Sequence, residues 1–310
     1  MEDSCCSLPI SSLSCHEDKA LCMSNEEMEE QWLPRVLFNS FHSDTEEEYI
    51  EILVSKEKII ESRSTEFLRC KWLRCEAIQW ILNMKDYFGF SSQTVYLAVI
   101  YLDRFLMQRS IDNGKPWLVQ LLTMACLSLA AKMDEAMAPP LVKYQSEQCC
   151  FHTITIRRME LHVLSTLEWR MNSVTPFAYL NYFAIKIIGS HFSVDLLSKS
   201  AGFIFSILKE INLVEFRASA IAAAAVLASF DDKLTEQELA LKMKPVCNRG
   251  LMESEHVYSS YSLMTRTPKK KSMESDLLLF PQLSKTHSSM DSFADTINYS
   301  SLADDNKKRR

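Results

Sequence analysis

The sequence predicts an all-α protein made of two tandem five-helix bundles with a disordered tail at each end. Apolar residues recur at the 3.6-residue period of an α-helix in one segment after another. In each half, the third helix is apolar on nearly every face, which is typical of a helix at the centre of a bundle. Only 5 of the 310 residues are glycine, and turn-dense β folds need many more.

The first bundle is expected over residues 49–172. Gly89 follows one periodic segment at the position of a C-terminal cap, and Ser91 precedes the next as an N-terminal cap. Pro116 stands in the first turn of another helix, where its missing N–H removes no hydrogen bond. The helices predicted for this bundle span 49–57, 66–88, 91–108, 116–135 and 153–169.

The second bundle is expected over residues 173–264, beginning with Thr175 as a cap and Pro176 at the first helical position. The apolar run 218–230 is too short for a membrane span and is flanked by charges. It therefore predicts a buried helix, and no membrane is expected as a partner. The helices predicted here span 177–188, 193–211, 218–230, 234–243 and 250–264.

Residues 1–48 and 265–310 lack helical periodicity. The first of these segments combines Ser and Cys clusters with acidic runs, and the second is rich in Ser, Asp and Lys. Such compositions bury too little apolar surface to offset the entropy that is lost on ordering. We therefore expect a disordered arm before the first bundle and a disordered basic, Ser-rich tail after the second.

The composition and the missing motifs argue against several classes of protein. A formal net charge of −6 does not favour nucleic acid as a partner. The 10 cysteines form no CxxC motif, and no basic segment precedes an apolar run at the N-terminus. Reduced thiols in the cytosol or nucleus are therefore expected.

The sequence also contains no recognisable catalytic site. GxSxG, HExxH, GxGxxG and P-loop motifs are missing, and His152 and His162 do not have the spacing of a helical metal pair. Adjacent carboxylates such as Asp134 and Glu135 are usually solvated at a helix end. We expect no catalytic residue, no metal and no cofactor.

Four charged residues lie in otherwise apolar helices. Asp103 and Arg104 fall inside a helix that should be buried, so an internal ion pair that joins helices is the favoured interpretation. Lys132 and Glu160 have two interpretations. They are either ordinary surface charges or a polar pair on an apolar face that binds the backbone of a partner.

Several segments resemble the cyclin box: "RCEAIQWIL", "YLAVIYLDRFL", "LAAKMDE" and "RRMELHVLSTLEWRMNSVTPFAYL". "FRASAIAAAAVLASF" resembles the matching helix of a second box, and "EEEYIEILVSKE" precedes the first. Over roughly residues 45–264 the chain resembles a plant D-type cyclin. The resemblance implies two stacked five-helix bundles in a regulatory subunit, not an enzyme, that binds and activates a cyclin-dependent serine/threonine kinase.

The resemblance also assigns roles to residues. Lys132 and Glu160 match the lysine and glutamate that bind kinase backbone groups in this family. A substrate-docking patch is implied at four residues: Leu73, Ala77, Trp80 and Gln120. The chain departs from the family pattern here, because Ala77 is smaller than usual and Glu76 adds a charge. Trp80 is equally well explained as a core residue.

The arm contains "LSCHE", which fits the Leu-x-Cys-x-Glu motif of D-type cyclins for retinoblastoma-type pocket proteins. In an extended chain, Leu13, Cys15 and Glu17 lie on one face, a shape suited to a shallow groove. The family resemblance thus implies a role in entry from G1 into S phase. Kinase inhibitors are further partners that it implies.

Two features of the tail suggest regulation and localisation. Thr267 precedes Pro268 and a run of lysines, which resembles a proline-directed phosphorylation site. The segments 266–271 and 307–310 are basic enough for nuclear import, or are simply solvated charge. We expect the nucleus as the location, with the cytoplasm as a second one.

Two other functions fit the same fold. One is a cyclin-fold scaffold that binds partners without activating a kinase. The other is a nucleic-acid-binding protein like transcription factor IIB, which shares the cyclin-box fold. The net acidity of the chain argues against the second.

Overall fold

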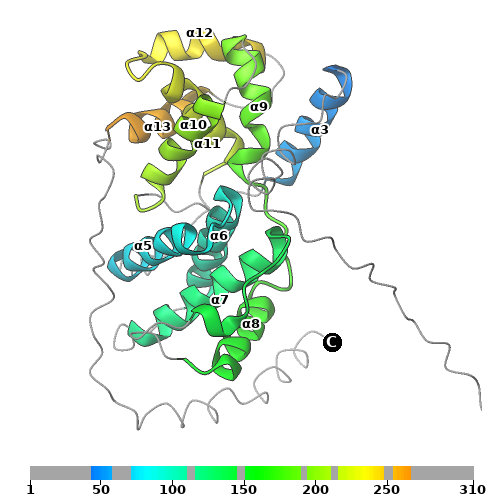
Figure 1. Cartoon of the computed structure of the whole chain (residues 1–310). Helices are drawn as coiled ribbons and strands as arrows, with labels where there is room; N and C mark the ends of the chain where they lie inside the picture. Colours follow the sequence, from blue (N-terminus) through cyan, green and yellow to red (C-terminus); the bar gives the residue numbers. More distant parts are fainter. Residues whose placement is uncertain are drawn as a thin grey trace, which may run out of the picture. The chain divides into compact units, whose positions relative to one another are not determined.

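The computed structural model describes seven segments of the chain: 43–57, 71–109, 116–144, 151–189, 194–210, 216–247 and 254–266. Every regular element within these segments is helical, and none of them contains a strand. The all-α prediction is therefore confirmed (Figure 1). Nearly all of the two predicted tails lies outside these segments.

The first bundle is centred on α7 (Pro116–Asp134). Around it pack α5 (Lys71–Phe88), α6 (Ser92–Gln108) and α8 (Thr153–Thr166), with a 3-10 turn η1 (Leu141–Tyr144) against α8. Every residue of α7 from Val119 to Ala131 is buried, as its all-round apolar sequence predicts. An 18-residue window of α7 has the length and composition of a membrane span, but 72% of it is buried in the bundle.

Helix α6 shows how local sequence sets the ends of elements. Ser91 is its N-cap, with the side-chain oxygen accepting a hydrogen bond from the Thr94 N–H at 3.0 Å. Gly89, between α5 and α6, has a φ of +70°, a conformation that favours glycine. Both predicted caps are thus present.

The second bundle is centred on α11 (Ala218–Phe230). Its other elements are η2 (Pro176–Tyr179), α9 (Leu180–Phe183), a π-helical turn η3 (Ala184–Ile188), α10 (Val194–Ile207), α12 (Glu236–Cys247) and α13 (Ser254–Arg266). Helix α11 contacts η2, α9, η3, α10 and α13 and is buried from Ala218 to Ala228. Its alanines allow neighbouring backbones to approach closely, as expected of a central helix.

Helix α3 (Ser43–Lys56) precedes the first bundle in sequence but is hydrogen-bonded to the second. It begins within the segment expected to be disordered. Its acidic N-terminal residues suit the positive end of a helix dipole. The Glu57 carboxylate, which follows α3, accepts hydrogen bonds from the Ser219 N–H (2.7 Å) and hydroxyl (2.8 Å) at the start of α11.

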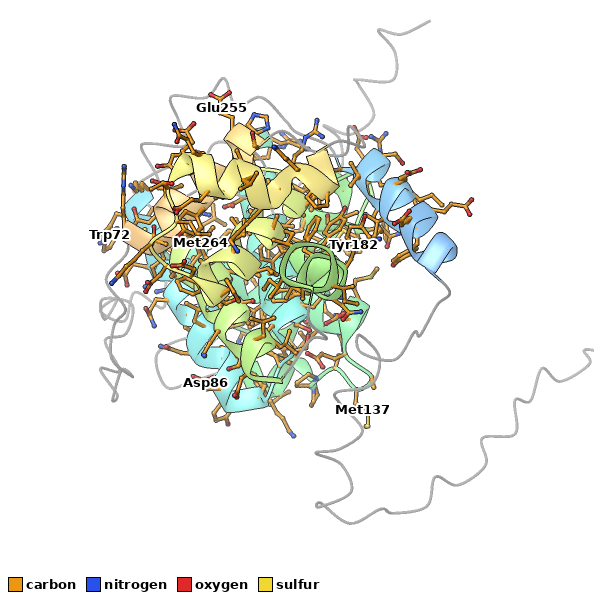
Figure 2. All side chains as sticks on the ribbon, turned by 90° about the horizontal axis from the view of Figure 1, so that it is seen from above. Trp72, Asp86, Met137, Tyr182, Glu255 and Met264 are labelled. Atoms are coloured by element: carbon orange, nitrogen blue, oxygen red, sulfur yellow. The ribbon has the colours of Figure 1, made fainter. Side chains whose placement is uncertain are left out.

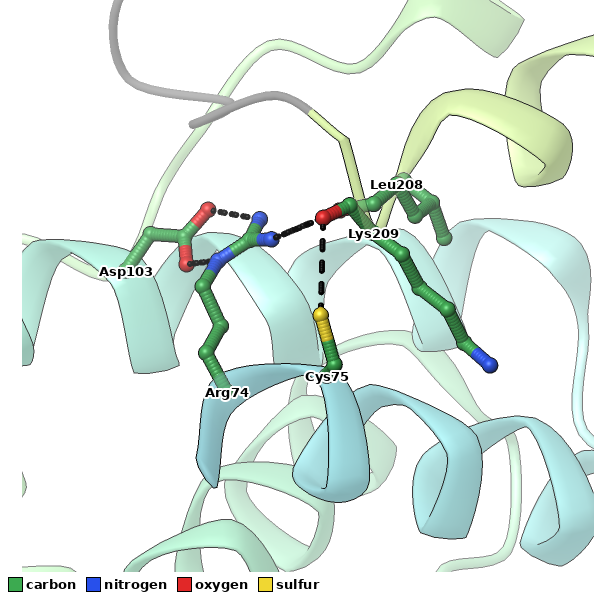
Figure 3. A network of polar contacts seen from close by, with 5 residues as sticks. All are labelled: Arg74, Cys75, Asp103, Leu208 and Lys209. Atoms are coloured by element: carbon green, nitrogen blue, oxygen red, sulfur yellow. Dashed lines mark hydrogen bonds and ion pairs between the residues drawn. The ribbon is translucent and has the colours of Figure 1, made fainter. Parts of the chain in front are cut away.

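A buried ion pair joins α5, α6 and the end of α10 (Figure 3). The Arg74 guanidinium donates to both carboxylate oxygens of Asp103, at 2.6 and 2.8 Å, and to the carbonyl oxygen of Leu208 at 2.8 Å. The predicted internal ion pair is thus confirmed for Asp103, with Arg74 as its partner. Arg104 differs from the prediction, because it is partly exposed and donates to the carbonyl oxygen of Arg170 at 2.7 Å.

Candidate protein-interaction site

Lys132 and Glu160 meet at one surface of the first bundle. The Lys132 Nζ lies 2.6 Å from Oε1 and 2.7 Å from Oε2 of Glu160. Lys132 stands in the last turn of α7 and Glu160 near the middle of α8, two helices that pack against each other. The Lys132 side chain is 43% exposed and that of Glu160 is 8% exposed, so Glu160 is not an ordinary surface charge.

This ion pair can still bind a partner while it stays formed. An ammonium group has three donor hydrogens, and each carboxylate oxygen has two lone pairs. Two ammonium hydrogens suffice for the contacts with Glu160, so a third is available for a carbonyl group, and Glu160 can accept from an N–H group. Hydrogen bonds to charged groups are stronger than neutral ones and, when made to main chain, tolerate variation in the partner's side chains.

Two buried ionisable groups of the first bundle have raised pKa values. Burial raises the pKa of the Tyr144 phenol above its ordinary value, and the charges of Glu160 and Glu135 add to the increase. Burial likewise raises the pKa of the Cys126 thiol in α7, so this thiol stays protonated. No group of three or more His, Cys, Asp or Glu residues within the described segments could hold a metal ion.

Large apolar side chains are exposed on the same stretch of chain as the pair, from the end of α7 to the turn after α8. Met137 is 87% exposed and projects away from the helices in Figure 2. The exposed members of this set, which we call the 133–169 surface, are Met133, Met137, Val142, Ile154, Leu161 and Trp169. Met133 and Leu161 stand next to Lys132 and Glu160 in sequence, and exposed apolar groups beside a charged pair are typical of a protein-binding surface.

Trp169 is presented by a strained turn. Glu168 and Trp169 have φ angles of +54° and +58°, the left-handed region that bulky residues rarely adopt. The turn closes α8 through a 2.8 Å hydrogen bond from the Trp169 N–H to the Leu164 carbonyl, and it leaves Trp169 67% exposed. Backbone strain of this kind is concentrated at functional sites, because the surrounding structure must maintain it.

Asp134 and Glu135 form hydrogen bonds with residues at the start of α6, contrary to the expectation of a solvated helix end. Asp134 accepts hydrogen bonds from the Ser91 hydroxyl and the Gln93 side-chain amide, both at 2.6 Å. Glu135 accepts from the Ser91 backbone N–H at 2.8 Å. The C-terminal end of α7 is therefore attached to the N-terminal end of α6.

The predicted substrate-docking patch is mostly buried. Ala77 is fully buried, Leu73 and Gln120 are also buried, and only Trp80 is partly exposed. The reason is that this face of α5 packs against α7, and a methyl side chain at position 77 cannot reach beyond it. The outward side chain nearby is Trp72, which is 57% exposed and which sequence reasoning missed.

Comparison with known proteins decides the family. Residues 40–172 match the family model "Cyclin, N-terminal domain". The chain is 36% identical over 277 residues to Cyclin-D5-1 of Arabidopsis thaliana, and the match covers 84% of each of the two proteins. The chain belongs to the plant D-type cyclins. It is also 46% identical over 161 residues to Cyclin-D1-1 of Oryza sativa subsp. japonica, a match that covers 51% of this cyclin and 44% of that relative.

The fold is also found in a solved structure. A viral cyclin from herpesvirus saimiri superposes with a TM-score of 0.53 at 15% sequence identity. The superposition covers 72% of this cyclin and 96% of the viral one. The two proteins share the cyclin fold.

Several residues predicted from the sequence lie outside the described segments. These are Leu13, Cys15 and Glu17 of the Leu-x-Cys-x-Glu motif, and Thr267 of the tail. Their roles stay predictions.

Sequence reasoning missed two parts of the site. The sequence pattern places Trp169 in an amphipathic helix, and the change to positive φ at Glu168 and Trp169 has no clear marker in the sequence, because neither residue is glycine. The sequence predicts Ser91 as a helix cap, but it does not predict that the Ser91 hydroxyl donates a hydrogen bond to Asp134. The polar residues Gln93 and Thr94, which follow the cap Ser91, are the feature of the sequence that indicates a polar partner for this helix end.

Proposed function

We propose that this D-type cyclin binds a cyclin-dependent serine/threonine kinase through the 133–169 surface and activates it. The observation that carries the proposal is the Lys132–Glu160 pair, whose charges are held 2.6 Å apart, with the exposed Met133 and Leu161 next to them in sequence. Membership of the D-type cyclins supports the same conclusion.

The mechanism is differential binding rather than chemistry by the cyclin. The pair would hold main-chain groups of the kinase, while Trp169 and its apolar neighbours are buried against a kinase helix. If the surface fits the active conformation better than the inactive one, binding shifts the kinase toward the active state. In that state the catalytic Lys–Glu ion pair and the activation loop of a kinase are in place.

The arm would then bring a substrate to the active kinase. Leu13 and Cys15 would fill apolar pockets of a retinoblastoma-type pocket protein, and Glu17 would accept hydrogen bonds. Tethering raises the effective concentration of the substrate at the kinase. The biological role we propose is promotion of G1/S entry in the nucleus, with 266–271 and 307–310 as import segments.

Kinase binding is tested by removing both charges of the pair. Lys132→Ala with Glu160→Ala should reduce affinity for a purified plant cyclin-dependent kinase by at least 100-fold in calorimetry. The matched control is Lys186→Ala with Glu47→Ala, which removes another Lys–Glu pair, on α3 and the second bundle. The control variant should bind like the wild type. Equal affinity of both double variants would refute the assignment.

Substrate delivery is tested separately in the complete complex. Cys15→Ala should abolish capture of a pocket-protein fragment and leave the kinase bound, because the motif and the pair lie in different parts of the chain. Undiminished capture would make "LSCHE" a coincidence. A cyclin that binds the kinase without raising its activity would support the scaffold alternative.

A further inference from the structure

We infer that the N-terminal end of α6 positions the kinase-binding end of α7, with Ser91 and Gln93 as the positioning residues. Neither residue belongs to the 133–169 surface, and they act on it through the carboxylates of Asp134 and Glu135. The inference rests on the proposed function, because it concerns how Lys132 is held for a kinase.

The two carboxylates lie over the first turn of α6. Asp134 accepts from the Ser91 hydroxyl and the Gln93 amide, and Glu135 accepts from the Ser91 backbone N–H. The buried Thr94 hydroxyl is within hydrogen-bond distance of both, 2.7 Å from Oδ2 of Asp134 and 2.5 Å from Oε1 of Glu135. Side chains from one helix end thus enclose the acidic end of another.

The attraction at this junction is electrostatic as well as geometric. The first N–H groups of α6 have no partner within the helix, and the N-terminal end of its dipole is positive. Two carboxylates placed there are stabilised by the dipole and by charge-assisted hydrogen bonds. The junction therefore fixes the last turn of α7 more firmly than apolar packing alone would.

Lys132 is two residues before Asp134, so the same turn carries the ammonium group over Glu160. Met133 lies between Lys132 and Asp134, and Met137 follows shortly after the junction. Holding this turn in place before the kinase arrives reduces the conformational entropy that binding would cost. Pre-organisation of the surface is thus the effect of the Ser91 contacts.

Gln93 extends the junction to the second bundle. Its amide nitrogen donates to Asp134, and its amide oxygen lies 3.4 Å from the hydroxyl of Thr175, the N-cap of η2. One side chain therefore links the kinase-binding end of α7 to the point where the second bundle begins. Gln93 and Ser91 should consequently affect kinase binding in the same direction.

The test uses the full chain and a purified plant cyclin-dependent kinase. Ser91→Ala should weaken binding roughly 10-fold, the size expected for hydrogen bonds to a charged group. Ser91→Thr keeps the hydroxyl and should restore affinity. Ser92→Ala is the matched control, because Ser92 is a neighbouring serine in the first turn of α6 that takes no part in the hydrogen bonds to Asp134 and Glu135. Gln93→Ala, which leaves the cap intact, should also weaken binding.

A double-mutant cycle separates positioning from a general loss of stability. If Ser91 acts through Lys132, the variant that combines Ser91→Ala with Lys132→Ala should bind no more than about 2-fold more weakly than Lys132→Ala alone. Fully additive losses would overturn the inference, as would wild-type affinity of both Ser91→Ala and Gln93→Ala. Failure of the wild-type cyclin to bind the kinase would instead refute the proposed function itself.

Discussion

The two bundles share an architecture but differ in how their central helices end. In the second bundle, α11 is buried from Ala218 to Ala228, and residues of the same chain form hydrogen bonds at both of its ends. Glu57 accepts hydrogen bonds from Ser219 at its start. At its end, the Tyr261 hydroxyl donates to the Asp231 carbonyl at 2.9 Å and accepts from the Leu234 N–H at 2.8 Å.

In the first bundle, the end of α7 is hydrogen-bonded to the start of α6, but its last turn also lies at an exposed surface. Its last turn carries a partly exposed lysine, and exposed apolar side chains follow it as far as Trp169. The comparison teaches that the same central-helix packing can support either an internal anchor or an interaction site. Both helix ends are hydrogen-bonded within the chain, and the difference is that the last turn of α7 also leaves a lysine and neighbouring apolar side chains exposed.

The largest expected effect is on the free energy of unfolding, at the buried ion pair where the two bundles meet. Arg74→Ala leaves the Asp103 carboxylate buried without its partner, so the free energy of unfolding should fall by about 3–5 kcal/mol. Urea denaturation of the full chain measures this. Combining Arg74→Met with Asp103→Leu should recover much of the loss, because no charge is then left buried. A loss below about 1 kcal/mol for Arg74→Ala would show that the ion pair does not join the bundles.

The next effect separates binding from stability at the surface of the first bundle. Trp169→Gly should weaken kinase binding by about 2 kcal/mol or more, as loss of an aromatic anchor does. The free energy of unfolding should stay the same or rise by up to about 1 kcal/mol, because glycine accepts the φ of +58° without strain. Calorimetric binding and urea denaturation measure the two quantities. A large fall in stability would mean that Trp169 supports the fold.

A smaller effect is expected at the anchored end of α11. Glu57→Ala removes the acceptor at its N-terminus and should lower the free energy of unfolding by about 1 kcal/mol. Kinase affinity should not change, because this contact lies outside the 133–169 surface. The control is Glu51→Ala, an exposed acidic residue of α3. If both variants are equally stable, Glu57 does not cap α11.

The smallest expected effect is the dependence of stability on pH that comes from His162. Burial, with a contribution from Arg109, lowers the pKa of His162 below its ordinary 6.5. The folded state therefore binds this proton less readily than the unfolded state, and stability should fall as pH drops below about 6.5. Since His162 is only half-buried, the loss should stay under about 1 kcal/mol. His162→Gln should flatten the melting temperature between pH 7 and 5, and His152→Gln, at an exposed residue, should not.

Periodicity and caps in the sequence were enough to predict most of the helices, because each depends on residues close in the chain. Ser91, Gly89 and the alanines of α11 are examples. Periodicity could not identify Arg74 as the partner of Asp103, because 29 residues separate them and many cations were available. The sequence predicts only part of α3, because this helix makes hydrogen bonds to the second bundle, more than 100 residues away along the chain.

The candidate site was predicted unevenly for the same reason. The family resemblance named Lys132 and Glu160, which the fold brings into contact. It also named Leu73, Ala77 and Gln120, which the fold buries. Side-chain exposure depends on what packs over a helix, as α7 packs over α5 here, and a motif carried over from relatives does not contain that information.

The most direct measurement is the activity of a purified plant cyclin-dependent kinase titrated with this cyclin. Phosphorylation of a pocket-protein fragment should rise with added cyclin and saturate at one cyclin per kinase, and the Lys132→Ala, Glu160→Ala variant should leave the kinase inactive. A folded cyclin that leaves the kinase inactive at every ratio would contradict the account, as would equal activation by that variant.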